Sequence, residues 1–154
     1  MLIYYFDASA FAKHYLREPG SQWVNGLLGQ VMQDRFVSVE LIGVETVCAI
    51  ARAEREKRIG RGLRDSLTAR AIGETHRALQ LAEVSRQILS HASQLALRRP
   101  LRAYDAIHLA TALQISNETR LLGLPAPIFI SADANLLAAA RAEGLTAENP
   151  NEHE

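Results

Sequence analysis

The chain has 154 residues, of which 48% are apolar and 22% charged, and its 17 Lys and Arg balance 17 Asp and Glu. This composition predicts a packed globular protein and excludes a disordered chain or a generic polyanion binder. The single cysteine, Cys48, excludes an intrachain disulfide, and with no CxxC pair and five scattered histidines a zinc site is not expected.

The N-terminal segment MLIYYF is apolar, but Asp7 follows it at once and no basic segment precedes it. It therefore lacks the pattern of a secretory signal peptide. No apolar run in the chain approaches the ~18 residues that would span a bilayer. We expect a cytoplasmic protein that does not associate with membranes.

Short apolar segments alternate with helical patterns along the chain. The expected strands are 2–6, 35–39, 128–131 and 145–148, with 81–84 ambiguous. The expected helices are 8–16, 21–33, 40–58, 63–78, one that Ser85 caps and that ends before Pro100, 101–116 and 134–142. This alternation predicts an α/β fold with helices packed on a small, mainly parallel sheet. We expect one domain over residues 1–150 and a polar tail over 151–154.

Two aspartates come directly after expected strands. Asp7 follows 2–6, and Asp133 follows 128–131 in the segment FISADANLL. Ligands of open parallel sheets bind beyond the carboxyl ends of the strands, so the two side chains are expected to face one another. Taken alone, each aspartate is better explained as a helix N-cap.

Glu45 lies within an expected helix. Because each helical residue advances by about 100°, Glu45 falls on the same stripe as Leu41, Val44 and Cys48. Cys48 itself is expected to be a small buried side chain. An acid on an apolar stripe is costly unless it is paired or binds a cation, and an ion pair with a buried arginine is the alternative.

Asp105 repeats this pattern in YDAIHLATAL, where Leu109 and Ala112 lie on its side of the helix. The alternative is that the helix begins later than expected and that Asp105 is an acid of its first turn. Considered together, Asp7, Glu45, Asp105 and Asp133 form a set of hard oxygen ligands suited to Mg²⁺ or Mn²⁺. Without a cation, the clustered carboxylates would raise one another's pKa.

Five segments together resemble a known family. They are DASAFAKHYLREPGS, LIGVETVCAIAR, LRAYDAIHLATAL, FISADANLLAAARAEGL and the closing ENP. Their order and spacing resemble the PIN domain, and more narrowly the VapC toxins of bacterial toxin–antitoxin pairs. The resemblance extends from Met1 to Pro150.

The resemblance implies a three-layer α/β/α sandwich and a metal-dependent endoribonuclease that uses Mg²⁺, with Mn²⁺ as a possible substitute. It implies cleavage of structured RNA, either transfer or ribosomal RNA, and inhibition of translation until a cognate antitoxin protein neutralises the toxin. It also implies a homodimer. The alternative is a catalytically silent PIN fold that binds RNA or docks a partner.

The resemblance also assigns roles to residues. The family's four acidic positions correspond to Asp7, Glu45, Asp105 and Asp133. Ser9 and Ser131 match small polar residues that support the acids by hydrogen bonding. Three basic residues are candidates for contact with the RNA backbone: Lys13, Arg17 and Arg52. For each of them the alternative is a solvated surface charge. His14 stands where many relatives carry Arg, and Glu40 has no assigned role.

Two other α/β classes place acids at strand ends. A phosphoacceptor receiver needs paired acids after the first strand and a Lys after a late strand, whereas this chain has a single Asp in the first place and Ser-Ala-Asp-Ala-Asn in the second. A haloacid-dehalogenase-type phosphatase needs DxD, and DAS lacks the second acid. Neither class fits the chain as well as the PIN domain.

Overall fold

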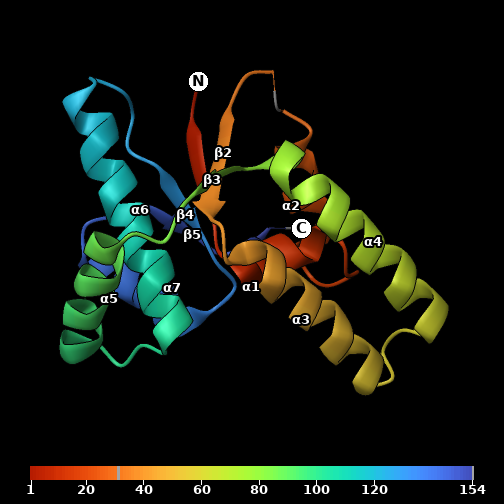
Figure 1. Cartoon of the computed structure of the whole chain (residues 1–154). Coiled ribbons are helices and arrows are strands. Elements are labelled where there is room, and N and C mark those ends of the chain that lie inside the picture. The colour runs from red at the N-terminus through yellow and green to blue at the C-terminus, as the bar shows by residue number, and fades with distance from the viewer. Residues whose placement is uncertain (31, 154) are drawn as a thin grey trace.

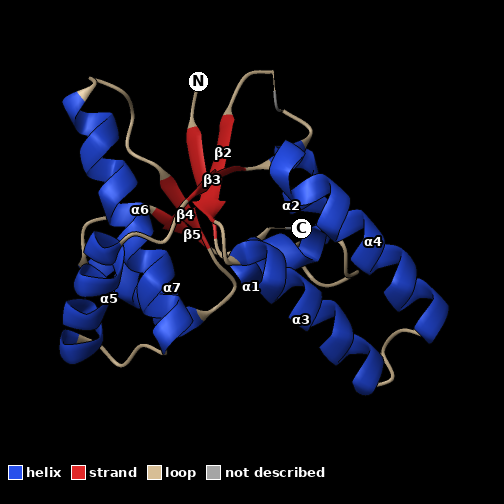
Figure 2. Cartoon of the chain, viewed as in Figure 1, coloured by secondary structure: helices blue, strands red, loops and turns tan. Residues whose placement is uncertain are grey.

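A computed structural model of the protein describes residues 1–30 and 32–153. In this part of the chain, five parallel strands form one sheet in the order β3-β2-β1-β4-β5 (Figure 2). The strands are β1 (Ile3–Phe6), β2 (Arg35–Val39), β3 (Gln80–Ala82), β4 (Ile128–Ile130) and β5 (Ala147–Glu148). The predicted small parallel sheet is therefore confirmed.

Helices cover both faces of this sheet (Figure 1). One face carries α5 (Arg86–Arg98), α6 (Ala103–Leu121) and α7 (Ala134–Ala142). The other carries α1 (Ala8–Phe11), α2 (Ser21–Leu28), α3 (Ile42–Arg55) and α4 (Arg61–Ala78). Two short 3₁₀ helices, η1 (Ala12–His14) and η2 (Pro150–Glu152), complete the order of elements. The arrangement is the predicted α/β/α sandwich.

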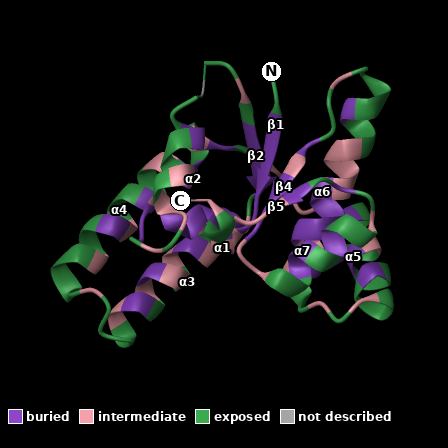
Figure 3. Ribbon diagram, turned by 180° about the vertical axis from the view of Figure 1, so that it is seen from behind, coloured by how far each residue is buried: buried purple, intermediate pink, exposed green. Residues whose placement is uncertain are grey.

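The central strand β1 is buried throughout, and its side chains alternate between two hydrophobic cores. Ile3 and Tyr5 pack with α5, α6 and α7, whereas Tyr4 and Phe6 pack with the helices of the opposite face. Figure 3 shows β1 buried and the outer surfaces of α4 and α5 exposed. Burial on both faces fixes β1, and with it the position of Asp7 at its carboxyl end.

The sheet order places a topological switch beside β1. The chain adds β2 and β3 on one side of β1, then returns to add β4 and β5 on the other. Connections that leave neighbouring parallel strands in opposite directions open a crevice beyond the carboxyl ends of those strands. The crevice here lies beyond Phe6 of β1 and Ile130 of β4, which are paired in register.

Several expected bounds are confirmed and others are wrong. The strand 35–39 and the helix 134–142 have the expected bounds, and Ser85 caps α5 by accepting a hydrogen bond from the Ile88 amide. The expected helix 8–16 is wrong because α1 ends at Phe11 and the chain tightens into η1.

Two further helices differ in length from the prediction. The expected helix 21–33 ends at Leu28, where Gly29 forms its C-cap, and Val31 lies outside the described residues. Helix α6 begins at Ala103 and continues to Leu121, beyond the expected end at 116, because no proline or glycine interrupts it before Gly123.

The residues after β5 pack against α2. A Cβ atom on Gly20, whose φ is +81°, would lie 2.3 Å from the Pro150 carbonyl oxygen, so this contact requires glycine. The His153 ring stacks on Trp23 with 4.1 Å between ring centroids. The expected polar tail is thus held against the domain up to His153, and Glu154 lies outside the described residues. Within the described chain, no helix is both long and apolar enough to cross a bilayer.

Candidate active site

Asp7 lies at the centre of a hydrogen-bond network that joins the ends of β1 and β4. Its carboxylate accepts hydrogen bonds from Ser9 Oγ at 2.8 and 2.9 Å, from the Ala10 amide at 2.8 Å and from Ser131 Oγ at 2.7 Å. Ser9 Oγ in turn accepts from the Ala132 amide at 2.8 Å. Asp7 therefore caps α1, as the simpler interpretation predicted, and both predicted supporting serines contact it.

The Asp7 carboxylate is almost fully buried, with 3% of the residue exposed. Burial raises the pKa of this carboxyl, and the electrostatic effect of His108 and the hydrogen bonds from Ser131, Ala10 and Ser9 oppose that rise only in part. No basic side chain among the described residues forms a salt bridge with Asp7. A buried carboxylate without a salt-bridge partner is an electrostatic setting that a bound cation would stabilise.

Glu45 reaches the same region from the first turn of α3. Its Oε2 atom lies 2.7 Å from His108 Nε2, and His108 Nδ1 lies 3.0 Å from the Tyr5 hydroxyl. The partner of Glu45 is therefore a buried histidine of α6, and the alternative of a buried arginine is wrong.

Asp105 and Asp133 both approach one arginine. Arg102 Nε lies 3.2 Å from Asp105 Oδ2, and its terminal nitrogen lies 3.7 Å from Asp133 Oδ2. Asp105 does lie in the first turn of α6, and Asp133 caps α7 by accepting from the Leu136 amide at 2.9 Å. Both simpler local roles are present, and both carboxylates also reach the site.

One pocket of about 790 Å³ joins these residues. All four predicted acids line it, together with Ser9 and His108. Four basic side chains line it as well: Lys13, Arg52, Arg58 and Arg102. A pocket lined by both acidic and basic side chains can bind a phosphate group through its basic residues while the acids hold a cation.

The acids are not gathered in a ready-made coordination shell. Over residues 1–30 and 32–153, no three His, Cys, Asp or Glu side chains lie close enough together to hold a metal ion. Glu45 bonds to His108, and Arg102 draws Asp105 and Asp133 to itself. The donor set suits a hard divalent cation, but Asp105 and Asp133 would have to leave Arg102 to bind one.

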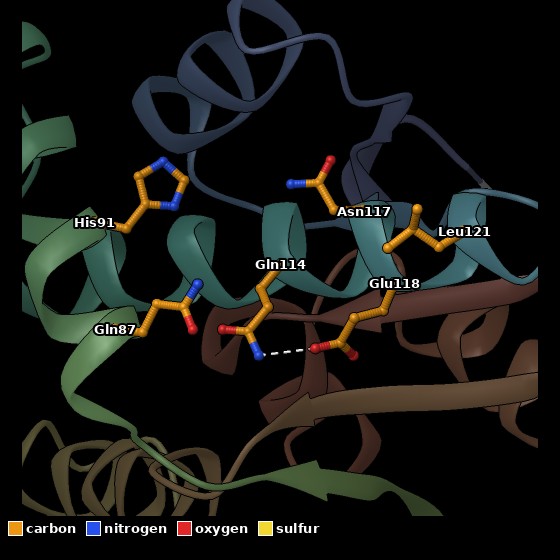
Figure 4. Close-up of a pocket in the computed structure, with 6 residues that line it drawn as sticks. All are labelled: Gln87, His91, Gln114, Asn117, Glu118 and Leu121. Carbon is orange, nitrogen blue, oxygen red and sulfur yellow. Dashed lines mark hydrogen bonds between the residues drawn. The ribbon is translucent and has the colours of Figure 1, made fainter.

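A second pocket of about 260 Å³ lies between α5 and α6 (Figure 4). Its described lining residues are Gln87, His91, Gln114, Asn117, Glu118 and Leu121. Gln114 donates to Glu118 across one turn of α6 at 2.8 Å. This pocket is separate from the acidic site, and its lining is dominated by amides.

Comparison with known protein families shows which family the chain belongs to. A family model described as "PIN domain" matches residues 4–119. The chain belongs to the PIN-domain family. This chain is 32% identical over 124 residues to Ribonuclease VapC45 and to Ribonuclease VapC49, both from Mycobacterium tuberculosis. Each alignment covers 76% of this chain and 79% of the relative.

A solved structure shares the fold. The complex VapBC2 from Rickettsia felis, bound to a DNA fragment from its promoter, contains a chain that matches this PIN domain with a TM-score of 0.62 and 11% identity. The match covers 96% of this chain and 98% of the other. Together with the two relatives, it confirms the predicted resemblance to VapC proteins.

The three predicted RNA contacts of the PIN domain lie in different settings. Arg52 is exposed and lines the pocket. Lys13 also lines it but is 4% exposed and lies 3.4 Å from Glu18, so a solvated surface charge is the wrong description of Lys13. Arg17 is exposed and is not among the residues that line the pocket.

The interpretation of the Glu45 stripe needs correction. The buried face of α3 consists of Ile42, Thr46, Ile50 and Ala53. Val44 is 68% exposed and Cys48 is exposed, so the prediction that Cys48 is buried is wrong. The apolar stripe beside Glu45 lines the pocket and does not belong to the core.

Two residues left without a clear role have structural partners. Glu40 accepts a hydrogen bond from the Val84 amide at 2.9 Å, which extends the pairing of β2 with β3. His14 Nδ1 lies 2.6 Å from the Asn25 side-chain oxygen on α2. Neither residue lines the pocket.

Sequence reasoning assigned no role in the site to Arg102, Tyr5 or His108. Arg102 is detectable in LRAYD, because a base three residues before an acid on one helix forms an i,i+3 pair. His108 lies three residues after Asp105 and therefore on nearly the same face of α6. Tyr5 carries no such local signal, since its role depends on a contact across 103 positions of sequence.

Proposed function

We propose that the chain is a VapC-type toxin, a divalent-metal-dependent endoribonuclease that cleaves structured RNA and so inhibits translation. One observation carries this proposal: four acids from separate parts of the chain line a single pocket at the carboxyl edge of the sheet. Similarity to two proteins named as VapC ribonucleases supports the same reaction. Transfer or ribosomal RNA is the proposed substrate.

Asp7, Glu45 and Asp105 would hold Mg²⁺ or Mn²⁺, and Asp133 would complete the acidic set. When bound, such an ion supplies an activated water and neutralises charge at the scissile phosphate. The protein contributes orientation: Ser9 and Ser131 fix Asp7, and His108 fixes Glu45.

The basic residues of the pocket have a separate task. Lys13 and Arg52 line it on the side of η1 and α3, where they would bind phosphates of the RNA backbone. Arg102 lies closest to the acids and would transfer from Asp105 and Asp133 to the phosphate when a metal ion and RNA bind. Exchange of one anionic partner for another keeps the guanidinium paired throughout.

The test uses purified, antitoxin-free protein incubated with total RNA and Mn²⁺ or Mg²⁺. We expect discrete fragments that disappear with EDTA and with Asp7→Asn. Sequencing the fragment ends identifies the target RNA. Equal cleavage by wild type and Asp7→Asn would exclude the proposed active site and assign the cleavage to a contaminant.

A catalytically silent PIN scaffold is the second candidate. It is favoured by the present arrangement of the acids, because no three of them are gathered for a metal ion in the described chain. On this alternative, Arg102 stays paired with Asp105 and Asp133, and His108 stays bonded to Glu45. RNA binding without cleavage, and no heat of Mn²⁺ binding by calorimetry, would establish it.

We also propose an antitoxin partner and a homodimer. The pocket mouth carries apolar side chains that the chain leaves exposed, among them Val44 at 68% and Tyr104 at 59%. Apolar residues next to a charged pocket are typical of a surface that another protein covers. Co-purification with the product of an adjacent gene and a sedimentation measurement of the mass test these two proposals.

A further inference from the structure

A chain of hydrogen bonds runs from the central strand to Glu45. Tyr5, on β1, is fully buried, and His108, on α6, is 1% exposed. Both ring nitrogens of His108 are engaged, Nδ1 with the Tyr5 hydroxyl at 3.0 Å and Nε2 with Glu45 Oε2 at 2.7 Å. The Tyr5 and His108 rings also meet edge to face, with 5.9 Å between centroids.

The direction of these bonds follows from the chemistry of the groups. An ionised carboxylate only accepts hydrogen bonds, so His108 Nε2 carries the proton that Glu45 receives. In a neutral imidazole, Nδ1 is then an acceptor, and the Tyr5 hydroxyl must be its donor.

We propose that Tyr5 and His108 are positioning residues that set the orientation of the Glu45 carboxylate in the pocket. This inference rests on the proposed function, in which Glu45 is a metal ligand. A glutamate has three rotatable bonds, which must all be fixed before its carboxylate holds one orientation, and the Glu45 side chain is 18% exposed. The bond from His108 holds Oε2, while Oε1 accepts no hydrogen bond within the described residues and is free for an ion.

The position of Tyr5 links Glu45 to Asp7. Tyr5 precedes Asp7 by two residues on the same strand and its extension, and successive residues of a strand alternate between faces. The strand β1 therefore carries one acid directly and orients a second one through His108. Asp7 and Glu45 are distant in the sequence, and both are thus positioned by the buried strand β1.

The test compares variants that keep or remove the donor to Glu45. His108→Gln retains an amide N–H near the position of Nε2, whereas His108→Leu has no donor. Tyr5→Phe removes only the hydroxyl that fixes the tautomer of His108. Thr46→Val is the matched control, because Thr46 is a buried neighbour of Glu45 whose hydroxyl, among the described residues, donates to the Ile42 carbonyl oxygen alone.

For each variant, Mn²⁺ affinity is measured by calorimetry and by the shift in melting temperature that Mn²⁺ produces, with RNA cleavage followed in parallel. We expect His108→Leu to weaken Mn²⁺ binding about 10- to 100-fold, the usual loss when the partner of a metal ligand is removed. Tyr5→Phe should weaken it less, His108→Gln should recover most of the affinity, and Thr46→Val should match wild type.

Two outcomes would overturn the inference: wild-type affinity in His108→Leu, or equal losses in His108→Leu and His108→Gln, which would mean that His108 contributes packing alone. If His108→Leu does not fold, Tyr5→Phe decides, and unchanged affinity there rejects the role of Tyr5 and His108. The proposed function fails separately, when wild type neither binds Mn²⁺ nor cleaves RNA, and the inference then fails with it.

Discussion

Ser131 donates a hydrogen bond of 2.7 Å to Oδ2 of Asp7 across 124 positions of sequence. The contact follows from the pairing of β1 with β4, because Phe6 and Ile130 are partners in register and Asp7 and Ser131 come next. The Asp7 amide also donates to the Ile130 carbonyl oxygen at 3.0 Å. Parallel pairing at the switch point thus creates a donor for a carboxylate that is buried there.

Replacing Ser131 by alanine should destabilise the metal-free protein. A hydrogen bond to a charged group contributes about 1.5–3 kcal/mol, and Asp7 would keep its bonds from Ser9 and Ala10. We expect Ser131→Ala to lower the free energy of unfolding by about 2 kcal/mol, measured by urea denaturation. Ser93→Ala is the control, since Ser93 is an exposed residue of α5 that donates to the Leu89 carbonyl oxygen, and a loss of equal size in both variants would contradict the prediction.

The burial of Asp7 predicts a pH dependence of stability. Burial raises its folded-state pKa above the ordinary value of 3.8, so the folded state binds more protons than the unfolded state above that pH. The free energy of unfolding therefore falls as pH rises through the interval between the two pKa values. Asp7→Asn cannot ionise and escapes this loss.

In chelator, we expect Asp7→Asn to melt at a higher temperature than wild type at neutral pH. The difference should shrink as pH falls and vanish below 3.8, where the wild-type carboxyl becomes protonated in both states. Melting curves over a series of pH values measure it. A difference that does not vary with pH would show that ionisation of Asp7 is not its cause.

Four of the five described strands, the parallel sheet and the meeting of the four acids in one region could be predicted because short-range patterns encode them, whereas the segment of β3 stayed ambiguous. Apolar runs end at Asp7 and near Asp133, and the helical repeat places Glu45 and Asp105 toward one side. The partners of those acids could not be predicted in the same way. His108 meets Glu45 only because α3 and α6 approach one another in three dimensions.

The error at Cys48 has a related physical cause. A helix that borders a pocket has two apolar faces, one for the core and one for the pocket, and the helical repeat does not distinguish them. On α3, Ile42 and Ile50 face the hydrophobic core, while Val44 and Cys48 face the pocket and solvent. Only the packing of α3 on the sheet decides which stripe is buried.

The exposure of Cys48 gives a direct chemical test of the pocket. The thiol is exposed and lines the pocket near Glu45, so a thiol reagent should modify it in the folded protein. A bulky adduct there should abolish RNA cleavage by occupying space, and Cys48→Ser should stay active and resist the reagent. Modification that requires denaturant, measured by mass spectrometry, would contradict the exposure of Cys48.

Removing Arg102 should strengthen metal binding. Arg102 pairs with Asp105 and Asp133, and a metal ion must compete with it for both. Because the Arg102 side chain is 83% exposed, its pairing contributes at most about 1 kcal/mol, and we expect Arg102→Ala to tighten Mn²⁺ binding by up to about fivefold. Arg120→Ala, at the far end of α6, is the control for calorimetry, and weaker binding in Arg102→Ala would exclude competition by Arg102.

A comparison of Arg52 with Arg17 distinguishes a role in the pocket from general surface charge. Both are exposed, but Arg52 lines the pocket and Arg17 does not. A side chain that neutralises an RNA phosphate releases counterions, so its loss weakens RNA binding and lowers the dependence of that binding on salt.

With Asp7→Asn as the background to prevent cleavage, Arg52→Ala should reduce the slope of log K against log salt by about 0.7, the value for one phosphate of a single strand. Arg17→Ala should leave the slope unchanged, because no part of the pocket wall is formed by that residue. Equal slopes for the two variants would mean that RNA follows the outer surface of the domain and does not enter the pocket through the side of α3.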